Sequence, residues 1–220
     1  MSTSPYSQSS EWKPKVIIFD LLTALLDSWT LWDASTPTGT AEEGRKWRKR
    51  YLELTFGAGV YVPYADLVQE SARQVNLPDS AAANLLRDWE SIQPWPEAGA
   101  VLQGLKALGY RLGVVTNCSK TLGHVAAARA GSEGVFDVVV TAEESEFYKP
   151  AKEAYRAALV AMGVGVEDAL FVAGSAGDVE GATEVGMKVV WHNRVGLDRK
   201  GEAVPLREGG RLDDALRGFL

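Results

Sequence analysis

Cysteine and histidine are scarce in this chain of 220 residues, which has one cysteine, Cys118, and two histidines. A single cysteine cannot form an intramolecular disulfide, so nothing in the sequence requires an oxidising compartment. These three residues are also too few for a zinc site or a histidine-centred relay, unless both histidines converge. A disulfide scaffold is therefore excluded.

Long apolar runs and an excess of positive charge are missing as well. No stretch approaches the ~20 apolar residues that span a bilayer. Residues 1–13 hold five serines, no arginine and no apolar run, which predicts a disordered tail rather than a secretory signal or a transit peptide. The 29 acidic and 23 basic residues give a formal net charge of −6, which argues against nucleic acid as a partner. We expect a cytoplasmic protein.

What the chain does contain is the material of an ordinary globular protein, with 46% apolar and 24% charged residues. Five short runs are almost continuously apolar, at residues 16–19, 112–115, 138–140, 170–172 and 189–191. Helical patterns lie between these runs, at residues 97–108, 121–130, 151–162 and 179–185. Apolar strands that alternate with helices predict a doubly wound parallel α/β sheet.

The connection between the first two predicted strands is far too long for one crossover helix, at about ninety residues. It contains helical patterns at residues 41–56, 64–75 and 80–92, and five of the seven tryptophans. We interpret residues 27–95 as a helical cap inserted over the carboxyl end of the first strand. Residues 14–26 and 96–220 then form the α/β core. A separate helical domain is the alternative.

Polar side chains follow four of the predicted strands. In chain order they are Asp20, Thr116 with Asn117, Lys149, and Ser175 with Asp178. Because ligands of open α/β sheets bind outside the carboxyl ends of the strands, we expect these side chains to converge. Each alone has a plainer explanation, such as a turn, a solvated lysine or the N-cap of a helix. Together they favour covalent catalysis by a carboxylate nucleophile.

In this order the residues resemble the four motifs of the haloacid dehalogenase superfamily, over nearly the whole chain from Lys15. More narrowly, the chain resembles the (S)-2-haloacid dehalogenase branch. That likeness is carried by Tyr148-Lys149-Pro150 with Tyr155, by Thr116-Asn117, and by Trp47-Arg48 with Leu52 and Glu53. The resemblance implies a hydrolase that breaks the carbon–halogen bond of a 2-haloacid through an aspartyl ester.

The resemblance also implies the catalytic residues. Asp20 is the nucleophile, and Thr116, Lys149 and Asp178 occupy the other three motif positions. Lys149 matches a residue that tunes the nucleophile, and water is activated near Asp178 to hydrolyse the ester.

For the substrate, the resemblance implies a second group of residues. Arg48 holds the carboxylate and helps to receive the halide, with which Asn117 assists. Tyr155 orders the site, and Ser175 matches an asparagine that positions the hydrolytic water. Leu22 and Leu52 complete the predicted substrate site. The remaining charges of the basic run 45–50 then form a solvated face.

Position 22 separates the chemistries of the superfamily. Its phosphatases place an aspartate there, because an alkoxide leaving group needs a proton from a general acid. Leu22 can donate nothing, whereas halide leaves without protonation. The dehalogenase branch usually has tyrosine there and Gly-Thr where this chain has Thr23-Ala24, so the usual hydroxyl is displaced by one residue or lost.

Further departures lie near the fourth motif, where Ala173 replaces a serine and Gly177 an aromatic residue that lines the halide pocket. They indicate a rebuilt pocket and a substrate larger than a short haloacid, or a changed reaction. Gly174 replaces the acid that usually helps Asp178 to bind Mg²⁺. We therefore expect no metal and no cofactor.

Two rival functions stay open. One is a Mg²⁺-dependent phosphohydrolase, which has the same fold but would lack its acid at Leu22. The other is a repurposed non-hydrolytic enzyme or binding protein for a larger carboxylic metabolite, favoured by Ala24, Ala173 and Gly177. The predicted partner is a small-molecule carboxylate, with no nucleic acid and no membrane, and a homodimer stays open.

Overall fold

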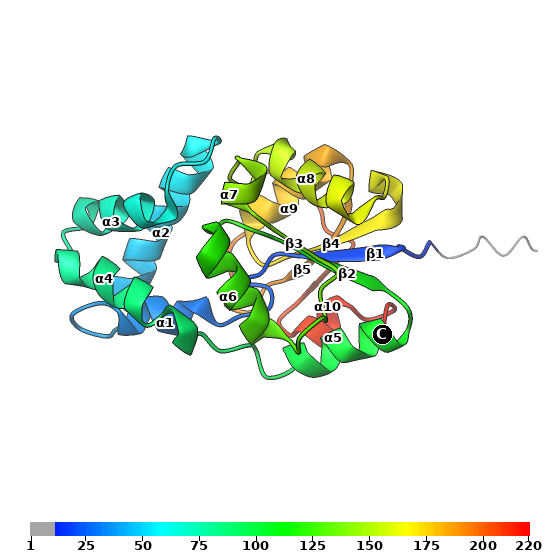
Figure 1. Cartoon of the computed structure of the whole chain (residues 1–220), viewed down its shortest axis with the longest axis horizontal. Coiled ribbons are helices and arrows are strands. Elements are labelled where there is room, and N and C mark those ends of the chain that lie inside the picture. The colour runs from blue at the N-terminus through cyan, green and yellow to red at the C-terminus, as the bar shows by residue number, and fades with distance from the viewer. Residues whose placement is uncertain (1–11) are drawn as a thin grey trace, which may run out of the picture.

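The computed structural model describes residues 12–220, in which six parallel strands form one sheet (Figure 1). Their order across the sheet is β3-β2-β1-β4-β5-β6. The strands are β1 (Val16–Phe19), β2 (Arg111–Thr116), β3 (Val138–Thr141), β4 (Ala169–Ala173), β5 (Lys188–His192) and β6 (Arg207–Gly209). The predicted α/β class with a parallel sheet is confirmed. Of these six strands, β6 was not predicted, because this mostly exposed edge strand has no apolar run.

Helices cover both faces of the sheet. On one face lie α5 (Ala98–Ala107), α6 (Lys120–Ala130) and α10 (Leu212–Ala215), and on the other α8 (Lys152–Met162) and α9 (Ala176–Val185) (Figure 1). The short α7 (Ala142–Ser145) follows β3. In β1, Ile17 and Phe19 pack with the first set and Val16 and Ile18 with the second. All four are fully buried, which explains the unbroken apolar run.

Four helices stand between β1 and α5 and extend beyond the carboxyl ends of the strands (Figure 1). They are α1 (Ser28–Ala34), α2 (Ala41–Ala58), α3 (Tyr64–Gln74) and α4 (Asp79–Arg87). The chain leaves and returns side by side, since the Asp27 amide donates to the Gln93 carbonyl at 2.8 Å and the Trp95 amide to that of Leu25 at 2.9 Å. The division into a core and a cap at 26/27 and 95/96 stays our prediction.

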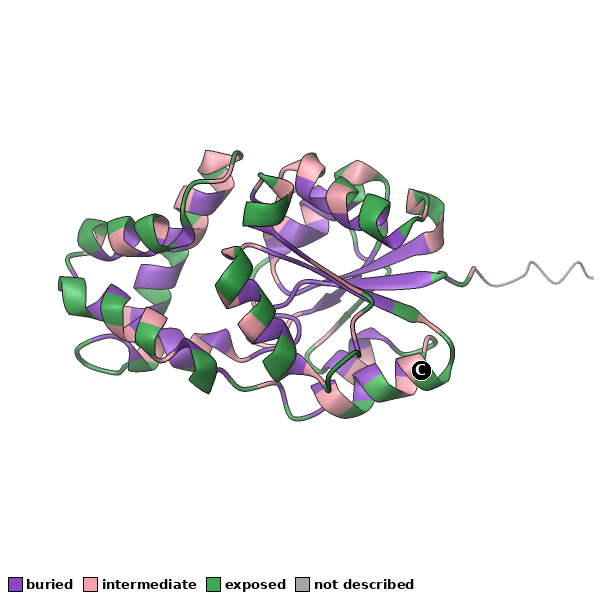
Figure 2. Cartoon of the chain, in the orientation of Figure 1, coloured by how far each residue is buried: buried purple, intermediate pink, exposed green. Residues whose placement is uncertain are grey.

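Aromatic rings form the interior of the four-helix region. Trp32 lies 4.5 Å from Trp47 and 4.9 Å from Tyr51, and Tyr64 lies 5.6 Å from both Tyr51 and Trp89, between ring centroids. Figure 2 shows the buried segments of these helices turned toward one another. Trp47 and Tyr51 are one turn apart on α2, and this packing fixes the rotation of that helix.

The predicted disordered tail, residues 1–13, lies outside the described residues except for Trp12 and Lys13. The Trp12 indole donates a hydrogen bond of 2.9 Å to the Glu167 carbonyl. Among residues 12–220, no helix is both long enough and apolar enough to cross a bilayer.

Candidate active site

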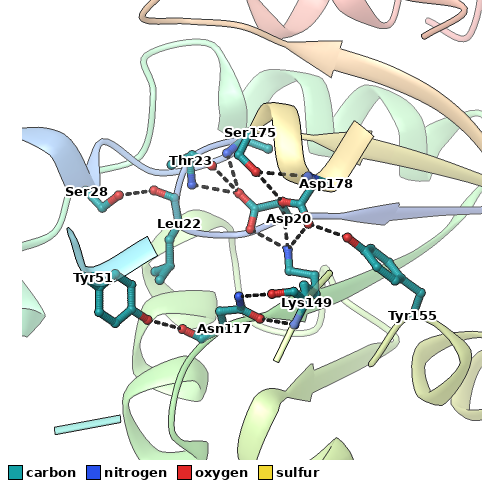
Figure 3. A network of polar contacts seen from close by, with 11 residues as sticks. Asp20, Leu22, Thr23, Ser28, Tyr51, Asn117, Lys149, Tyr155, Ser175 and Asp178 are labelled. Atoms are coloured by element: carbon teal, nitrogen blue, oxygen red, sulfur yellow. Dashed lines mark hydrogen bonds and ion pairs between the residues drawn. The ribbon is translucent and has the colours of Figure 1, made fainter. Parts of the chain in front are cut away.

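Asp20 follows the last residue of β1 and is almost completely buried. Its Oδ2 accepts three hydrogen bonds, from the Thr23 amide at 3.0 Å, the Thr23 hydroxyl at 2.6 Å and the Ala24 amide at 3.1 Å (Figure 3). Its Oδ1 accepts one, from Lys149 Nζ at 2.8 Å. The carboxylate is therefore held at the carboxyl end of the central strand by the turn that follows it.

Thr23 and Gly174 form one arrangement. The hydroxyl that the dehalogenase branch carries at position 24 is not lost here but comes from Thr23, one residue earlier. It still donates a hydrogen bond to Asp20. A Cβ atom at position 174 would lie 2.2 Å from Thr23 Oγ1 and 2.7 Å from Asp20 Oδ2. A side chain at position 174 is thus incompatible with the Thr23–Asp20 contact, so these two departures from the family pattern depend on each other.

Lys149 joins the two carboxylates of the site. Its ammonium lies 2.8 Å from Asp20 and 3.2 Å from Asp178, with 3% of the side chain exposed. The Asn117 side chain holds the Lys149 backbone, donating from Nδ2 to the carbonyl at 2.8 Å and accepting from the amide at 2.7 Å (Figure 3). Asn117, predicted to assist with the halide, therefore positions Lys149 in this structure.

Asp178 lies in the first turn of α9, directly beside Lys149. Tyr155 donates from its hydroxyl to Asp178 Oδ1 at 2.8 Å, and Ser175 donates to Oδ2 at 3.2 Å. Ser175 is also the N-cap of α9, because its hydroxyl accepts from the Asp178 amide. The N-cap, which was the plain explanation for Asp178, is therefore Ser175 instead, and Asp178 lies within the first turn of the helix.

Lys149, Asp20 and Asp178 shift one another's pKa values. Burial alone would raise the pKa of Asp20, but the charge and hydrogen bond of Lys149 and the bonds from Thr23 hold that pKa below its ordinary value. Burial opposes the Lys149 ammonium, yet Asp178 and Asp20 outweigh it and raise the pKa of Lys149. Burial and the negative charge of Asp20 raise the pKa of Asp178. Asp20 is thus a stable carboxylate and Asp178 a stronger base than usual.

This donor set does not fit Mg²⁺. The Lys149 ammonium lies between Asp20 and Asp178, where a cation would have to bind both carboxylates. Gly174 offers no ligand, and the space for one is taken by Thr23. In the described part of the chain, no group of three or more His, Cys, Asp or Glu residues is arranged to hold a metal ion.

Arg48 is the buried member of the basic run, with 3% of its surface exposed. Its guanidinium lies 4.0 Å from the centre of the Trp29 ring, and its Nε and Nη1 atoms have no hydrogen-bond partner among the described residues. Burial lowers the pKa of Arg48 to about 10, against the opposing charge of Asp20 and others, so it remains a cation at neutral pH. A buried, unpaired guanidinium is costly unless an anion binds it.

The other predicted site residues are placed as follows. Thr116, at the end of β2, is buried, and its hydroxyl has no partner in the described region. Leu22 is buried with 7% exposed, and its carbonyl accepts from the Ser28 hydroxyl. Leu52 is partly buried and lines a cleft together with Ser175.

Gly177 does not leave open space in this cleft. A Cβ atom there would lie 2.8 Å from Cε2 of Phe56, on helix α2. The Phe56 ring therefore occupies the room that a side chain at position 177 would need, and the pocket is not simply enlarged.

Two contacts of the site were not foreseen from the sequence. Trp29 stacks on Arg48, and the Tyr51 hydroxyl donates to the Asn117 carbonyl at 3.1 Å. Tryptophan enrichment in residues 27–95 was the available signal for Trp29. Nothing local marks Tyr51, because its partner lies 66 residues further along the chain.

Known proteins resemble this chain in sequence and in fold. The family model described as haloacid dehalogenase-like hydrolase matches residues 17–192. The haloacetate dehalogenase H-2 of Moraxella sp. (strain B) is 29% identical over 84% of this chain and 88% of its own length. The (S)-2-haloacid dehalogenase 4A of Burkholderia cepacia is 27% identical over 88% of this chain and 89% of its own. A crystal structure of an L-2-haloacid dehalogenase, 28% identical, superposes with a TM-score of 0.84 and covers 94% of this chain and 99% of that one.

Proposed function

The chain belongs to the haloacid dehalogenase-like hydrolase family, and we propose that it hydrolyses the carbon–halogen bond of a 2-haloacid, with Asp20 as the nucleophile. The observation that carries this proposal is that the site contains two buried groups of opposite charge with different surroundings. Asp20 is an ionised carboxylate held by four donors, whereas the Nε and Nη1 atoms of the Arg48 cation have no hydrogen-bond partner within residues 12–220. A substrate with a carboxylate for Arg48 and an electrophilic carbon for Asp20 uses both.

Substrate binding begins at Arg48 in this mechanism. Its guanidinium presents two donors to the carboxylate of the haloacid, and the free Thr116 hydroxyl donates to the same group. Trp29 keeps the guanidinium in place through its ring face. The carbon that bears the halogen then faces Asp20, which is the geometry that covalent catalysis requires.

The first chemical step is displacement of halide by Asp20. Among residues 12–220, three donors hold Oδ2 while Oδ1 accepts from the Lys149 ammonium alone, so Oδ1 forms the bond to the α-carbon. The carbon–halogen bond breaks, the halogen leaves with the bonding electron pair, and an ester of Asp20 results. No proton is needed by the leaving halide, which is consistent with an apolar Leu22.

The second step is hydrolysis of this ester. Asp178, whose pKa burial and Asp20 raise, takes a proton from water as that water attacks the Asp20 carbonyl carbon. The Thr23 and Ala24 donors around Oδ2 stabilise the oxyanion that develops there. Collapse of this intermediate breaks the bond between the Asp20 carbonyl carbon and Oδ1, and the leaving alkoxide takes the proton from Asp178. A 2-hydroxyacid is released, and Asp20 and Asp178 are regenerated as carboxylates. Asn117, Tyr155 and Ser175 position Lys149 and Asp178 for these steps.

The rival phosphohydrolase lacks support in the site. Leu22 supplies no general acid, and Lys149 occupies the place between Asp20 and Asp178 that a divalent cation needs. The cytoplasmic location, the homodimer and the repurposed binding protein remain predictions of the sequence.

A single turnover in heavy-oxygen water tests the proposal. With either enantiomer of 2-chloropropionate, the reaction should release chloride, label the Asp20 side chain and give an unlabelled 2-hydroxyacid, because water attacks the enzyme ester. Mass spectrometry of the protein and of the product reads both positions. Label in the product and none in Asp20 would sink the covalent mechanism, and no chloride from either enantiomer would sink the activity.

A further inference from the structure

A cleft of about 440 Å³ opens beside the site, between helix α2, the segment 195–200 and the start of α9. Its lining mixes apolar and cationic side chains. The apolar part is Trp29, Leu52, Phe56, Val195 and Leu197, and the cations are Arg45, Lys49 and Lys200. This volume is within the range of small-molecule sites.

Some of the charged side chains that line the cleft form ion pairs with described residues, and others do not. Of its two acids, Glu53 is bound by Arg50 at 2.7 Å, which leaves Asp198 without an ion pair in the described part of the chain. Arg45, Lys49 and Lys200 likewise form no ion pair with a described residue. Lys49 and Lys200 both act on the charge of Glu53, and Lys200 lies 6.0 Å from the Phe56 ring centre, so these two cations lie on the same side of the cleft.

Two lining residues connect this cleft to the proposed reaction. Trp29 stacks on the guanidinium that we assign to the substrate carboxylate, and Ser175 donates to Asp178. A haloacid held by Arg48 would therefore direct its α-substituent along Trp29 and Phe56 toward the three cations.

We propose that the substrate is a 2-halodicarboxylic acid, whose α-substituent is apolar near the reacting carbon and ends in a second carboxylate held by Arg45, Lys49 and Lys200. This inference rests on the proposed function and adds the substrate class. The cations are exposed, so their effect is a preference rather than an absolute requirement.

The test compares 2-bromohexanedioate with 2-bromohexanoate, which differ only in the terminal group. Bromide release should give a kcat/KM about five- to tenfold higher for the diacid, as expected of several exposed cations acting on one carboxylate. The preference should disappear in high salt, since these charges are screened.

Single substitutions locate the effect. Lys49→Gln and Lys200→Gln should each lower the diacid-to-monoacid ratio about two- to threefold. Lys46→Gln is the matched control, because Lys46 is exposed on the same helix and does not line the cleft, and it should leave the ratio unchanged. Binding of the unreactive hexanedioate and hexanoate, measured by calorimetry, should follow the same order.

Failure of this inference and failure of the proposed function give different results. Equal kcat/KM values for the two bromoacids, or a ratio that Lys46→Gln lowers as much as Lys49→Gln does, would overturn the dicarboxylate subsite while bromide release upholds the dehalogenase. No bromide from either acid, with hexanedioate still bound in preference to hexanoate and dependent on Lys49, would overturn the dehalogenase and uphold the anion subsite.

Discussion

Two buried charges from different parts of the molecule, Asp20 and Arg48, have opposite surroundings. Asp20, at the end of β1, receives four hydrogen bonds and a lysine counter-charge. Arg48, on helix α2, is just as buried, but it lies against an aromatic ring, and its Nε and Nη1 atoms have no hydrogen-bond partner among the described residues. Asp20, at the end of the sheet, has its hydrogen-bond partners without substrate. Arg48, on the helical side, would gain such partners from a bound anion.

This difference separates two uses of buried charge. Pairing on the sheet side costs little, because each charge has a partner, and it fixes the nucleophile before substrate arrives. Burying the Arg48 guanidinium lowers the stability of the substrate-free protein. Binding of a carboxylate removes this free-energy cost. Substitutions on the two sides should therefore have opposite effects on stability.

The largest expected effect is loss of turnover in Asp20→Asn. An amide has the shape of the carboxylate but is a far poorer nucleophile, so kcat should fall by about 10⁴-fold or more. Halide release under substrate saturation measures it, and circular dichroism checks that the fold is intact. Turnover within tenfold of wild type would remove Asp20 from the nucleophile role.

The strongest effect on stability is expected for Lys149→Met. This change leaves Asp20 and Asp178 as two buried carboxylates without their shared cation, which should cost about 3–5 kcal/mol of unfolding free energy at neutral pH. Urea unfolding at pH 7 measures the change. A variant as stable as wild type would mean that the two carboxylates are not held as this geometry implies.

Arg48→Met should move stability in the opposite direction. Methionine removes an unpaired buried charge while retaining apolar bulk against Trp29, so the unfolding free energy should rise by about 1–3 kcal/mol. Calorimetric binding of a carboxylate substrate analogue should be lost at the same time. Reduced stability would show that Arg48 has a structural partner, and retained binding would return it to the solvated basic face.

The smallest effect concerns pH. The Tyr155 hydroxyl donates to the ionised form of Asp178 and so lowers the pKa of that carboxyl, against the larger effect of burial. Tyr155→Phe removes this donor, so the pKa of Asp178 should rise and the acid limb of kcat should move to higher pH. A pH–rate profile measures the shift. A lowered kcat with an unmoved acid limb would indicate that Tyr155 supports packing alone.

Much of the architecture follows from local patterns in the chain. The five apolar runs are strands, and the predicted family is confirmed by the family model and by the dehalogenase relatives. Strand β6 and helix α1 were missed, because Arg207–Gly209 has no apolar run and the signal in Ser28–Ala34 is only seven residues long. Both are stabilised by neighbours that a local pattern does not contain.

The candidate site divides in the same way. Asp20, Thr116, Lys149 and Asp178 could be named from the sequence, because a parallel sheet brings the carboxyl ends of its strands to one edge. The role of Asn117 could not, since its amide groups bind the backbone of Lys149, which is 32 residues away. The position of the hydroxyl group of Thr23 depends on the absence of a side chain at Gly174, on another strand end.

The sequence alone thus determined five strands of the sheet, the order of its motifs and the prediction that Asp20 is a nucleophile, since alternation, apolar runs and leaving-group requirements are local properties. Only the tertiary structure decided which charges are paired. It placed Lys149 between two carboxylates, left the Nε and Nη1 atoms of Arg48 without a hydrogen-bond partner in the described part of the chain, and filled the space above Gly177 with Phe56. These outcomes depend on contacts between segments far apart in the chain, where burial multiplies the energy of every satisfied or unsatisfied charge.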